Sequence, residues 1–154
     1  QRVISPSEMS VAVLQNLNHY HLYVSSAAIG DIEFHQNQNK IKKTSINKSL
    51  PIKRSPDILA QVLKEKPDTL KTVGFAAETN LSYEILNEKW NRKPVDLLIG
   101  TKVHNGLTPE CSKVSGFSND NAHYSFMENN QIIFEGGLSK SSLAQKILQR
   151  FFRD

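Results

Sequence analysis

The sequence predicts an α/β domain in three layers, with a mostly parallel sheet, helices on both faces and a C-terminal hairpin. Candidate helices alternate with candidate strands along most of the chain. The candidate strands are short and continuously apolar, which is typical of parallel strands that are covered on both faces. The length of 154 residues suits one domain, and a domain of this size buries about 70% of the surface of its unfolded chain.

The first helix should begin at Ser5. The segment Ser5-Pro6-Ser7-Glu8 combines a capping box with proline at the first helical position. An apolar stripe at helical spacing follows, which contains Met9, Val13, Leu14 and Leu17. The helix should end near residues 18–19. The apolar segment 22–29 is then a strand that continues into Gly30-Asp31. Residues 30–50 are polar and rich in Asn, Gln and Lys, which predicts a long loop or flap.

The middle of the chain repeats the pattern of helix and strand. Ser55-Pro56-Asp57 is a second capping signal, so a helix should open there. Its inward face should consist of Ile58, Leu59, Val62 and Leu63. Residues 70–75 form a buried strand, 83–92 a third helix and 95–99 another apolar strand, and residues 104–121 form a loop rich in Gly and Asn.

The last part of the chain predicts a hairpin and a final helix. Residues 122–126 and 132–134 should pair around Glu128-Asn129-Asn130. The helix should begin near Ser139 and carry its apolar residues on one face; these are Leu143, Ala144, Ile147, Leu148 and Phe151. The complete order of elements favours a Rossmann-like fold. A flavin- or NAD-binding Rossmann domain would also need a Gly-x-Gly-x-x-Gly turn after the first strand, and the chain has none there.

Composition limits the classes of function. A net charge of +4 and a pI near 9.2 permit an anionic partner, but nucleic-acid binders carry denser Lys and Arg stripes with stacking aromatics. We therefore expect neither a nucleic-acid partner nor a membrane, since no apolar run approaches the roughly 18 residues of a span. The single cysteine, Cys111, cannot form an internal disulfide, which suggests a reducing cytoplasm. Because the chain begins with Gln1 rather than Met, we expect it to be cut from something longer.

A basic segment, Lys40-Ile41-Lys42-Lys43, stands between the first strand and the second helix. By charge alone it is either a solvated loop or a binding site for a polyanion. The five histidines have no metal-ligand spacing, so no protein-bound metal is expected. Cys111 lies in a polar segment with no histidine paired to it, so the sequence gives no reason to expect Cys111 to act as a nucleophile.

Four motifs in register carry a family resemblance. These are Lys40-Ile41-Lys42-Lys43, then Pro56-Asp57-Ile58-Leu59-Ala60, then Val73-Gly74-Phe75-Ala76-Ala77-Glu78-Thr79, and Leu138-Ser139-Lys140-Ser141-Ser142-Leu143-Ala144. In this order they resemble the phosphopantothenoylcysteine synthetase family, the C-terminal half of a bacterial bifunctional coenzyme A biosynthesis protein. Ser26-Ala27-Ala28-Ile29-Gly30-Asp31 and Gly116-Phe117 with Asp120 are similar to further family segments. The resemblance covers nearly all of residues 1–154.

The resemblance implies a ligase that joins 4′-phosphopantothenate to L-cysteine, with CTP cleaved to CMP and pyrophosphate and Mg²⁺ assisting. It implies a homodimer, and FMN only in an upstream decarboxylase half. Lys40 would be the catalytic lysine, which contacts the nucleotide. The implied CTP-binding residues are Ser25, Ser26, Ala27, Asp31, Lys40, Pro56, Asp57, Ile58, Leu59, Phe75, Lys89 and Lys93. Lys89 and Lys93 are spaced four apart, so a clamp from one helix face is expected.

Several of these residues also have a purely structural interpretation. Asp57 suits the first turn of a helix, Lys89 and Lys93 suit a helix C-terminus, and Phe75 suits a core strand. The chain also departs from the family, because Gly100-Thr101-Lys102-Val103 replaces the usual Ala-Asn-Asp-Val. The glycine-rich nucleotide loop and the Asn segment expected upstream are absent from residues 1–154. The alternative is therefore a non-catalytic nucleotide-binding or assembly module derived from this fold.

Overall fold

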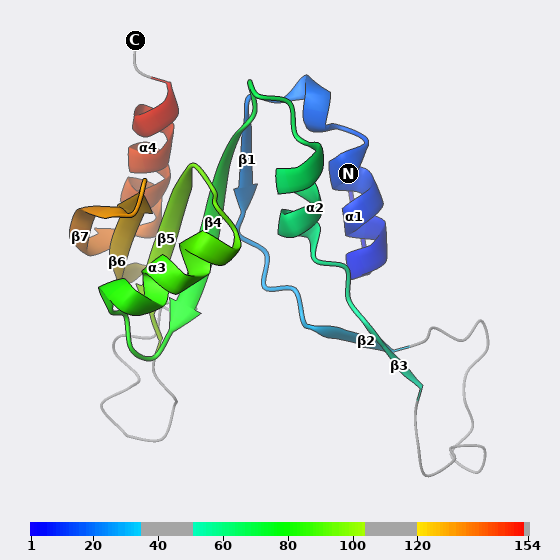
Figure 1. Ribbon diagram of the computed structural model, residues 1–154, viewed down its shortest axis with the longest axis horizontal. Helices are drawn as coiled ribbons and strands as arrows, with labels where there is room; N and C mark the ends of the chain where they lie inside the picture. The colour runs from blue at the N-terminus through cyan, green and yellow to red at the C-terminus, as the bar shows by residue number, and fades with distance from the viewer. Residues whose placement is uncertain (35–50, 104–119, 153–154) are drawn as a thin grey trace.

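The computed structural model describes residues 1–34, 51–103 and 120–152. A five-stranded sheet forms the centre of the molecule, and a two-stranded ribbon projects from it (Figure 1). The helices are α1 (Pro6–Leu14), α2 (Ile58–Glu65), α3 (Tyr83–Arg92) and α4 (Lys140–Phe151), with a short 3₁₀ turn, η1, at Leu17–His19. The strands are β1 (Leu22–Ser25), β2 (Ile32–Phe34), β3 (Ile52–Arg54), β4 (Lys71–Glu78), β5 (Leu97–Lys102), β6 (Asn121–Glu128) and β7 (Gln131–Ser139).

The sheet is parallel in its first half and antiparallel in its second. Its strand order is β1-β4-β5-β6-β7. The β1–β4 and β4–β5 pairs are parallel, whereas β5–β6 and β6–β7 are antiparallel. The carboxyl ends of β1, β4 and β5 therefore lie at one edge of the sheet, where ligands of open α/β sheets commonly bind.

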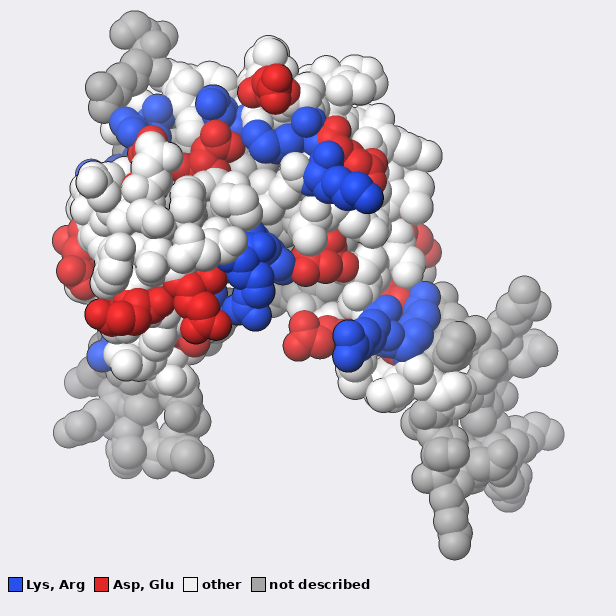
Figure 2. Space-filling model, viewed as in Figure 1, with Lys and Arg blue, Asp and Glu red and all other residues white. Residues whose placement is uncertain are grey.

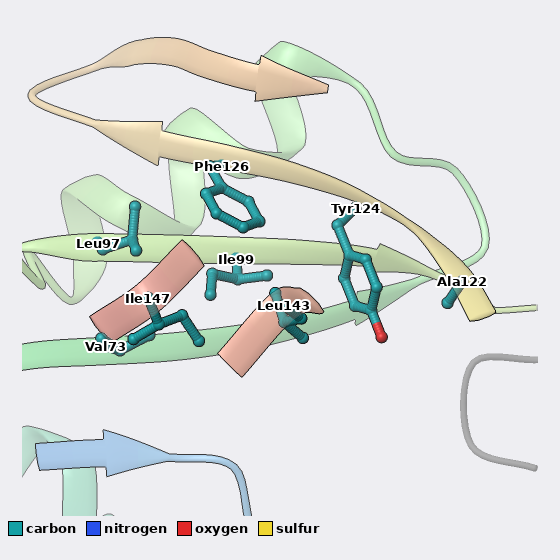
Figure 3. Packing of buried hydrophobic residues seen from close by; sticks show 8 residues of the cluster. All are labelled: Val73, Leu97, Ile99, Ala122, Tyr124, Phe126, Leu143 and Ile147. Carbon is teal, nitrogen blue, oxygen red and sulfur yellow. The ribbon is translucent and has the colours of Figure 1, made fainter. Parts of the chain in front are cut away.

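Helices cover both faces of the sheet, which confirms the predicted three layers. On one face, Leu143 and Ile147 of α4 pack against β4, β5 and β6 residues that are all under 10% exposed (Figure 3). On the other face, Leu86 of α3 packs with Ala76, Leu98 and Met127, and Leu59 of α2 joins them. A third cluster joins α1 and η1 to α2: Met9, Val13 and Leu14 of α1 pack against the buried residues Leu17, Ile58, Val62 and Leu70. The domain thus buries apolar residues on both sides of its central strands.

The caps and turns agree with the sequence at most elements. Ser5 caps α1 by accepting from the Glu8 amide, and Ser139 caps α4 by accepting from Ser142. Asn129 and Asn130 have positive φ angles of 48° and 61°, as a two-residue hairpin turn between β6 and β7 requires. The hairpin and the two capped helix starts are therefore confirmed.

Some boundaries differ from the predictions. Strand β1 ends at Ser25, so the predicted strand over 22–29 was too long; residues 26–30 form a connecting loop instead. Helix α2 begins at Ile58 with Asp57 as its cap, so Ser55 and Pro56 precede the helix. The strands β2 and β3 pair at the two ends of the predicted 30–50 loop, and their alternation was too short to detect.

The predicted apolar face of α4 is also partly wrong. Leu143 and Ile147 are buried, but Leu148 is 52% exposed and Ala144 is exposed. A helix on one face of a sheet buries only part of its circumference, so Ala144 and Leu148 lie beyond the contact, whereas Phe151 packs against the buried cluster. Among the described residues, no helix has the length and apolar content to cross a membrane.

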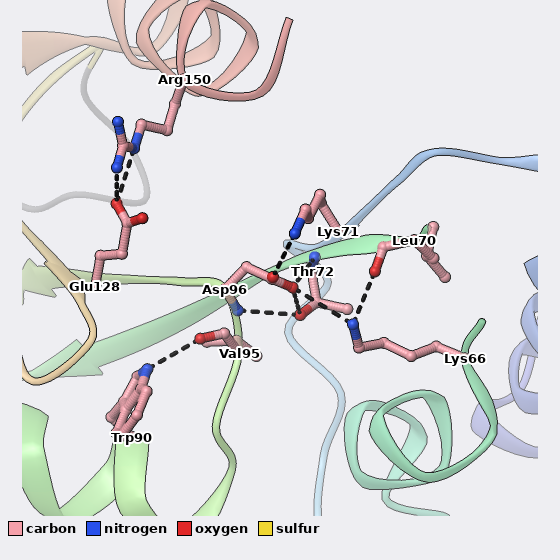
Figure 4. A network of polar contacts seen from close by, with 9 residues as sticks. All are labelled: Lys66, Leu70, Lys71, Thr72, Trp90, Val95, Asp96, Glu128 and Arg150. Carbon is pink, nitrogen blue, oxygen red and sulfur yellow. Dashed lines mark hydrogen bonds and ion pairs between the residues drawn. The ribbon is translucent and has the colours of Figure 1, made fainter. Parts of the chain in front are cut away.

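A polar network holds the amino ends of β4 and β5 together (Figure 4). Asp96 accepts hydrogen bonds of 2.8 Å from both the amide and the hydroxyl of Thr72, which is fully buried. Lys66 and Lys71 lie 3.6 Å and 3.4 Å from the same carboxylate. Burial opposes ionisation of Asp96, but the Thr72 bonds and the two lysines outweigh it and hold the pKa of Asp96 below its ordinary value. The network fixes the end of the sheet opposite to the cleft described next.

Candidate functional site

A cleft of about 670 Å³ opens at the carboxyl edge of the parallel strands. Its size lies within the range of small-molecule sites, about 300–1,000 Å³. The end of β1, the start of α2, the ends of β4 and β5, and the start of α4 all contribute to it. The lining residues are Ser25, Ser26, Ala27, Ala28, Ile29, Gly30, Asp31, Arg54, Ser55, Pro56, Asp57, Ile58, Leu59, Phe75, Ala77, Lys93, Thr101, Tyr124, Lys140 and Leu143.

Ten of the twelve residues expected to bind CTP line this one cleft. They are Ser25, Ser26, Ala27, Asp31, Pro56, Asp57, Ile58, Leu59, Phe75 and Lys93. They come from four separate segments of the chain, which the fold brings to one place. Of the other two, Lys89 does not line the cleft, and Lys40 lies outside the described residues, as do Lys42, Lys43, Cys111 and Gly116-Phe117.

The loop after β1 forms one side of the cleft. Ser26 and Ile29 donate backbone hydrogen bonds of 3.1 Å to Val24 and Ala27, so the chain turns tightly as it leaves the strand. Asp31 then accepts a 2.9 Å hydrogen bond at its carbonyl from the Ser55 amide. This bond ties the loop to the segment that leads into α2, so both sides of the cleft are joined at its base.

The start of α2 is fixed by Asp57. Its carboxylate accepts from the Ala60 amide at 3.1 Å and from Lys93 Nζ at 2.8 Å. Burial raises the pKa of Asp57, but the hydrogen bonds from Lys93 and Ala60 outweigh this and leave the pKa below its ordinary value. The Asp57 side chain is therefore ionised near neutral pH, and it both caps α2 and holds Lys93 at the cleft.

The expected clamp of Lys89 and Lys93 on one helix face is not formed. Lys93 is the C-cap of α3, with φ −139° and ψ 86°, and is no longer helical. Its ammonium pairs with Asp57, whereas Lys89 pairs with Glu78 at the end of β4. The spacing rule holds only inside a continuous helix, so the end of α3 sends the two side chains to different partners.

Sequence reasoning missed several polar residues of the cleft. Arg54 ends β3 beside the α2 start, while Thr101, Tyr124 and Lys140 lie toward α4. Neither Arg54 nor Lys140 forms an ion pair with the described carboxylates. Lys140 belongs to the motif Leu138–Ala144, so the sequence could have indicated it as a site residue. Arg54 and Tyr124 belong to no such motif, and only the fold brings them to the same cleft.

The charges around the cleft are mixed. On the face shown in Figure 2, Lys and Arg side chains are interspersed with Asp and Glu, unlike the one-sign stripe typical of nucleic-acid binders. Within residues 1–34, 51–103 and 120–152, no three His, Cys, Asp or Glu side chains gather as they would to hold a metal ion. The described part of the cleft therefore offers isolated cations and backbone donors for a ligand with several anionic groups.

The fold and the cleft define an α/β domain with a nucleotide-sized site at the carboxyl edge of its parallel strands. The chain belongs to the family described as the DNA/pantothenate metabolism flavoprotein C-terminal domain, which matches residues 1–153. It is 32% identical to the coenzyme A biosynthesis bifunctional protein CoaBC of Vibrio parahaemolyticus over 152 residues, 96% of this chain and 36% of that protein. The CoaBC of Escherichia coli is 32% identical over 123 residues, 77% of this chain and 29% of that protein.

Solved structures share the fold. The DNA/pantothenate metabolism flavoprotein of Streptococcus pneumoniae superimposes with a TM-score of 0.71 at 18% identity, over 97% of this chain and 70% of that one. The C-terminal domain of a CoaBC superimposes with a TM-score of 0.67 at 20% identity, over 97% and 62%. The chain spans about a third of the length of its curated relatives. The comparisons thus confirm the family and the α/β fold that the sequence predicts.

Proposed function

We propose that this chain forms the nucleotide-binding part of a ligase that joins 4′-phosphopantothenate to L-cysteine at the expense of CTP. One observation carries the proposal: ten residues expected to bind CTP, from four segments of the chain, line a single cleft. The name of the relatives, coenzyme A biosynthesis bifunctional protein, supports the same step. A cytoplasmic homodimer remains our expectation for the assembled enzyme.

In the proposed reaction, the carboxylate of 4′-phosphopantothenate attacks the α-phosphorus of CTP. Pyrophosphate leaves, and an acyl-cytidylate forms. The cysteine amine then attacks the acyl carbon, and CMP leaves with the electron pair of the broken carbon–oxygen bond. Neither step needs a covalent bond to the protein, so catalysis depends on alignment of the reactants and on cations beside the phosphates.

The α2 side of the cleft has groups suited to the nucleotide. We assign the cytosine and ribose to the backbone of Ser25–Ala27 and to the segment Pro56–Leu59, beside Phe75. Arg54 then supplies positive charge to the triphosphate, together with Lys40 from the 35–50 segment. Lys93 has its charge balanced by Asp57 at 2.7 Å, so it contributes less net charge than Arg54 does.

Mg²⁺ fits this site as a complex with the triphosphate. Mg²⁺ commonly binds through one or two carboxylates plus substrate phosphates. Asp31 and Asp57 are the acids of the described cleft, and Asp57 is occupied by Lys93 and Ala60. Bound there, the metal would neutralise phosphate charge, while the protein residues orient the reactants. FMN has no role in this part of the proposal.

The test is pyrophosphate release from CTP in the presence of 4′-phosphopantothenate and L-cysteine. It should be run on this chain and on a version extended upstream, with ATP, GTP and UTP as controls. Release that requires 4′-phosphopantothenate and prefers CTP supports the proposal. An extended version that binds CTP but releases no pyrophosphate favours instead a non-catalytic nucleotide-binding module, in line with Thr101 and Lys102 in place of the usual Asn-Asp.

A further inference from the structure

Strand β7 forms one end of the five-stranded sheet, beside α4 (Figure 1). It pairs with β6 on one side, and its other side has no strand partner among the described residues. The Lys140 amide donates a 2.9 Å hydrogen bond to the Asp120 carbonyl, which continues the β6–β7 register by one residue. Hydrogen-bonded pairs alternate along an antiparallel ladder, so the backbone groups of Glu135 and Gly137 point away from β6. Beyond β6 these groups have no hydrogen-bond partner in the part of the chain that the structure describes.

The outer edge of β7 has few of the features that protect an exposed strand. The strand has nine residues and contains neither Lys nor Pro, two residue types that commonly block the pairing of an edge with another chain. Its register shift lies opposite Phe126 and Met127, near the hairpin turn, so residues 134–139 form a regular strand. This segment is long enough to pair with a further strand.

Gly136 and Gly137 lie in the middle of this regular segment. Glycine weakens a strand interior, and it often marks a place where another backbone approaches closely. A Cβ on Gly136 would lie 3.3 Å from the Phe134 ring, so Gly136 has a packing role within the chain. A Cβ on Gly137 would contact nothing within 4 Å. Gly137 therefore leaves open space where the backbone of β7 points outward.

A groove of about 590 Å³ lies between this hairpin and the second half of α4. Its lining combines apolar residues of β6 and β7 with polar residues of α4: Phe126, Ile133, Phe134, Lys146, Gln149 and Arg150. The Lys146 ammonium lies 4.7 Å from the centroid of the Phe134 ring and forms no ion pair with a described carboxylate. Arg150 pairs with Glu128, but no acid lines the groove and α4 contains none. The groove therefore offers apolar surface together with unbalanced positive charge.

We propose that β7 and this groove bind an extended, acidic segment of a partner protein, which adds to the sheet as a further strand. Backbone hydrogen bonds to Glu135 and Gly137 supply the affinity of such strand addition. Acidic side chains of the segment on the α4 face pair with Lys146 and give the interaction its charge preference. None of the groove residues lines the cleft at the carboxyl edge of the parallel strands, so this surface does not depend on the proposed function.

Charge disfavours a second copy of this chain as the occupant. Two β7 strands that pair antiparallel would place two α4 helices on the same face of one continuous sheet. Each α4 contains Lys140, Lys146 and Arg150 and no acid, so the two helices would repel each other. A lipid surface would attract these cations, but it would leave the outward backbone groups of β7 without hydrogen-bond partners. An acidic strand satisfies both the charge and the backbone.

The test measures the binding of two fluorescently labelled peptides by anisotropy, each with the nine-residue length of β7. One peptide alternates valine and glutamate, and the other alternates valine and lysine. Wild type should bind the glutamate peptide at least about tenfold more tightly than the lysine peptide. Lys146→Glu should weaken binding of the glutamate peptide by about tenfold. Lys64→Glu is the matched control, because it makes the same charge change at an exposed position of α2, and it should change the affinity by less than about twofold.

A second variant, Gly137→Pro, tests the strand pairing itself. It removes an outward amide and no ladder bond to β6, so it should weaken binding of the glutamate peptide by at least about tenfold. Its urea denaturation curve shows whether the variant is folded, and Lys146→Glu decides the question if it is not.

Several results would overturn the proposal. These are no binding of the glutamate peptide, equal affinity for the two peptides, or equal affinity of wild type and Lys146→Glu for the glutamate peptide. Dimerisation of wild type in sedimentation experiments that Gly137→Pro abolishes would identify a second copy as the occupant instead. Binding to phosphatidylserine vesicles without binding to the glutamate peptide would identify a lipid surface.

Discussion

Replacement of Gly100 by alanine tests the close packing of α3 on the sheet. Gly100 is a buried residue of β5. A Cβ on Gly100 would lie 2.5 Å from Leu81 Cδ1 and 2.7 Å from Leu86 Cδ2. The best carbon–carbon separation is about 3.5–4.0 Å, so both methyl groups would have to move by about an ångström.

The expected cost follows from how little room these side chains have. Leu86 is 1% exposed and cannot turn outward, so the strain must be shared with the backbone of α3. Overpacking of this kind costs about 1–3 kcal/mol, while the loss of glycine freedom in the unfolded chain returns about 0.4–1 kcal/mol. We expect Gly100→Ala to lower the free energy of unfolding by about 1–2 kcal/mol.

Urea denaturation followed by tryptophan fluorescence measures this change. Trp90 is the single tryptophan, and its indole donates a 2.9 Å hydrogen bond to the Val95 carbonyl, so unfolding alters its surroundings. Gly137→Ala is the control, because nothing lies within 4 Å of a Cβ built there; its stability should change by less than about 0.5 kcal/mol. If Gly100→Ala is as stable as Gly137→Ala, the close packing described here is wrong.

Two further predictions concern the carboxylates that fix each end of the sheet. Asp96→Ala should lower the free energy of unfolding by about 1.5–3 kcal/mol, because it leaves the buried amide and hydroxyl of Thr72 without their charged acceptor; a loss below about 0.5 kcal/mol would contradict this. The pKa of Asp96 is lower in the folded chain, so its stabilisation is complete above the unfolded pKa of about 3.9 and disappears as the pH falls through the folded value. Wild type should therefore lose stability between about pH 5 and 3 more steeply than Asp96→Asn, and equal slopes in urea titrations would refute the assignment. Asp57→Ala removes the α2 cap and the partner of Lys93, which should cost about 0.5–2 kcal/mol; Asp57→Asn keeps a capping oxygen and should cost less, and the reverse order would show that the charge matters more than the cap.

Much of the fold follows from local signals in the sequence. Ser5 and Ser139 cap their helices as expected, and Asn129-Asn130 turns the hairpin. These features depend on a few neighbouring residues, so the sequence contains them directly. The strands β2 and β3 have three residues each and pair across the 35–50 segment; no periodicity in three residues distinguishes a strand from a loop. The extension of β5 to Lys102 depends on its pairing with β4 and β6.

The candidate site depended on the family motifs, and the fold added what those motifs lack. Composition and charge indicated only that an anion was compatible with the chain. The motifs supplied Asp57, Phe75 and Lys93, but they could not show that Lys93 pairs with Asp57 or that Lys89 turns to Glu78. Arg54 and Tyr124 lie 70 residues apart and share the cleft only because the end of β3 and the first half of β6 both lie near the carboxyl edge of the parallel strands. Contacts at that distance along the chain are set by topology, which the local pattern does not encode.

The most direct test of the central claim is a calorimetric titration of CTP into wild type, Lys40→Ala, Arg54→Ala and Lys89→Ala. We predict that wild type binds CTP in preference to other nucleoside triphosphates. Lys40→Ala and Arg54→Ala should each weaken binding by about tenfold or more, as expected for the loss of a charge-assisted contact. Lys89→Ala should stay within about twofold, because Lys89 pairs with Glu78 outside the cleft. Equal CTP affinity in wild type, Lys40→Ala and Arg54→Ala would contradict the assignment of this cleft to the nucleotide.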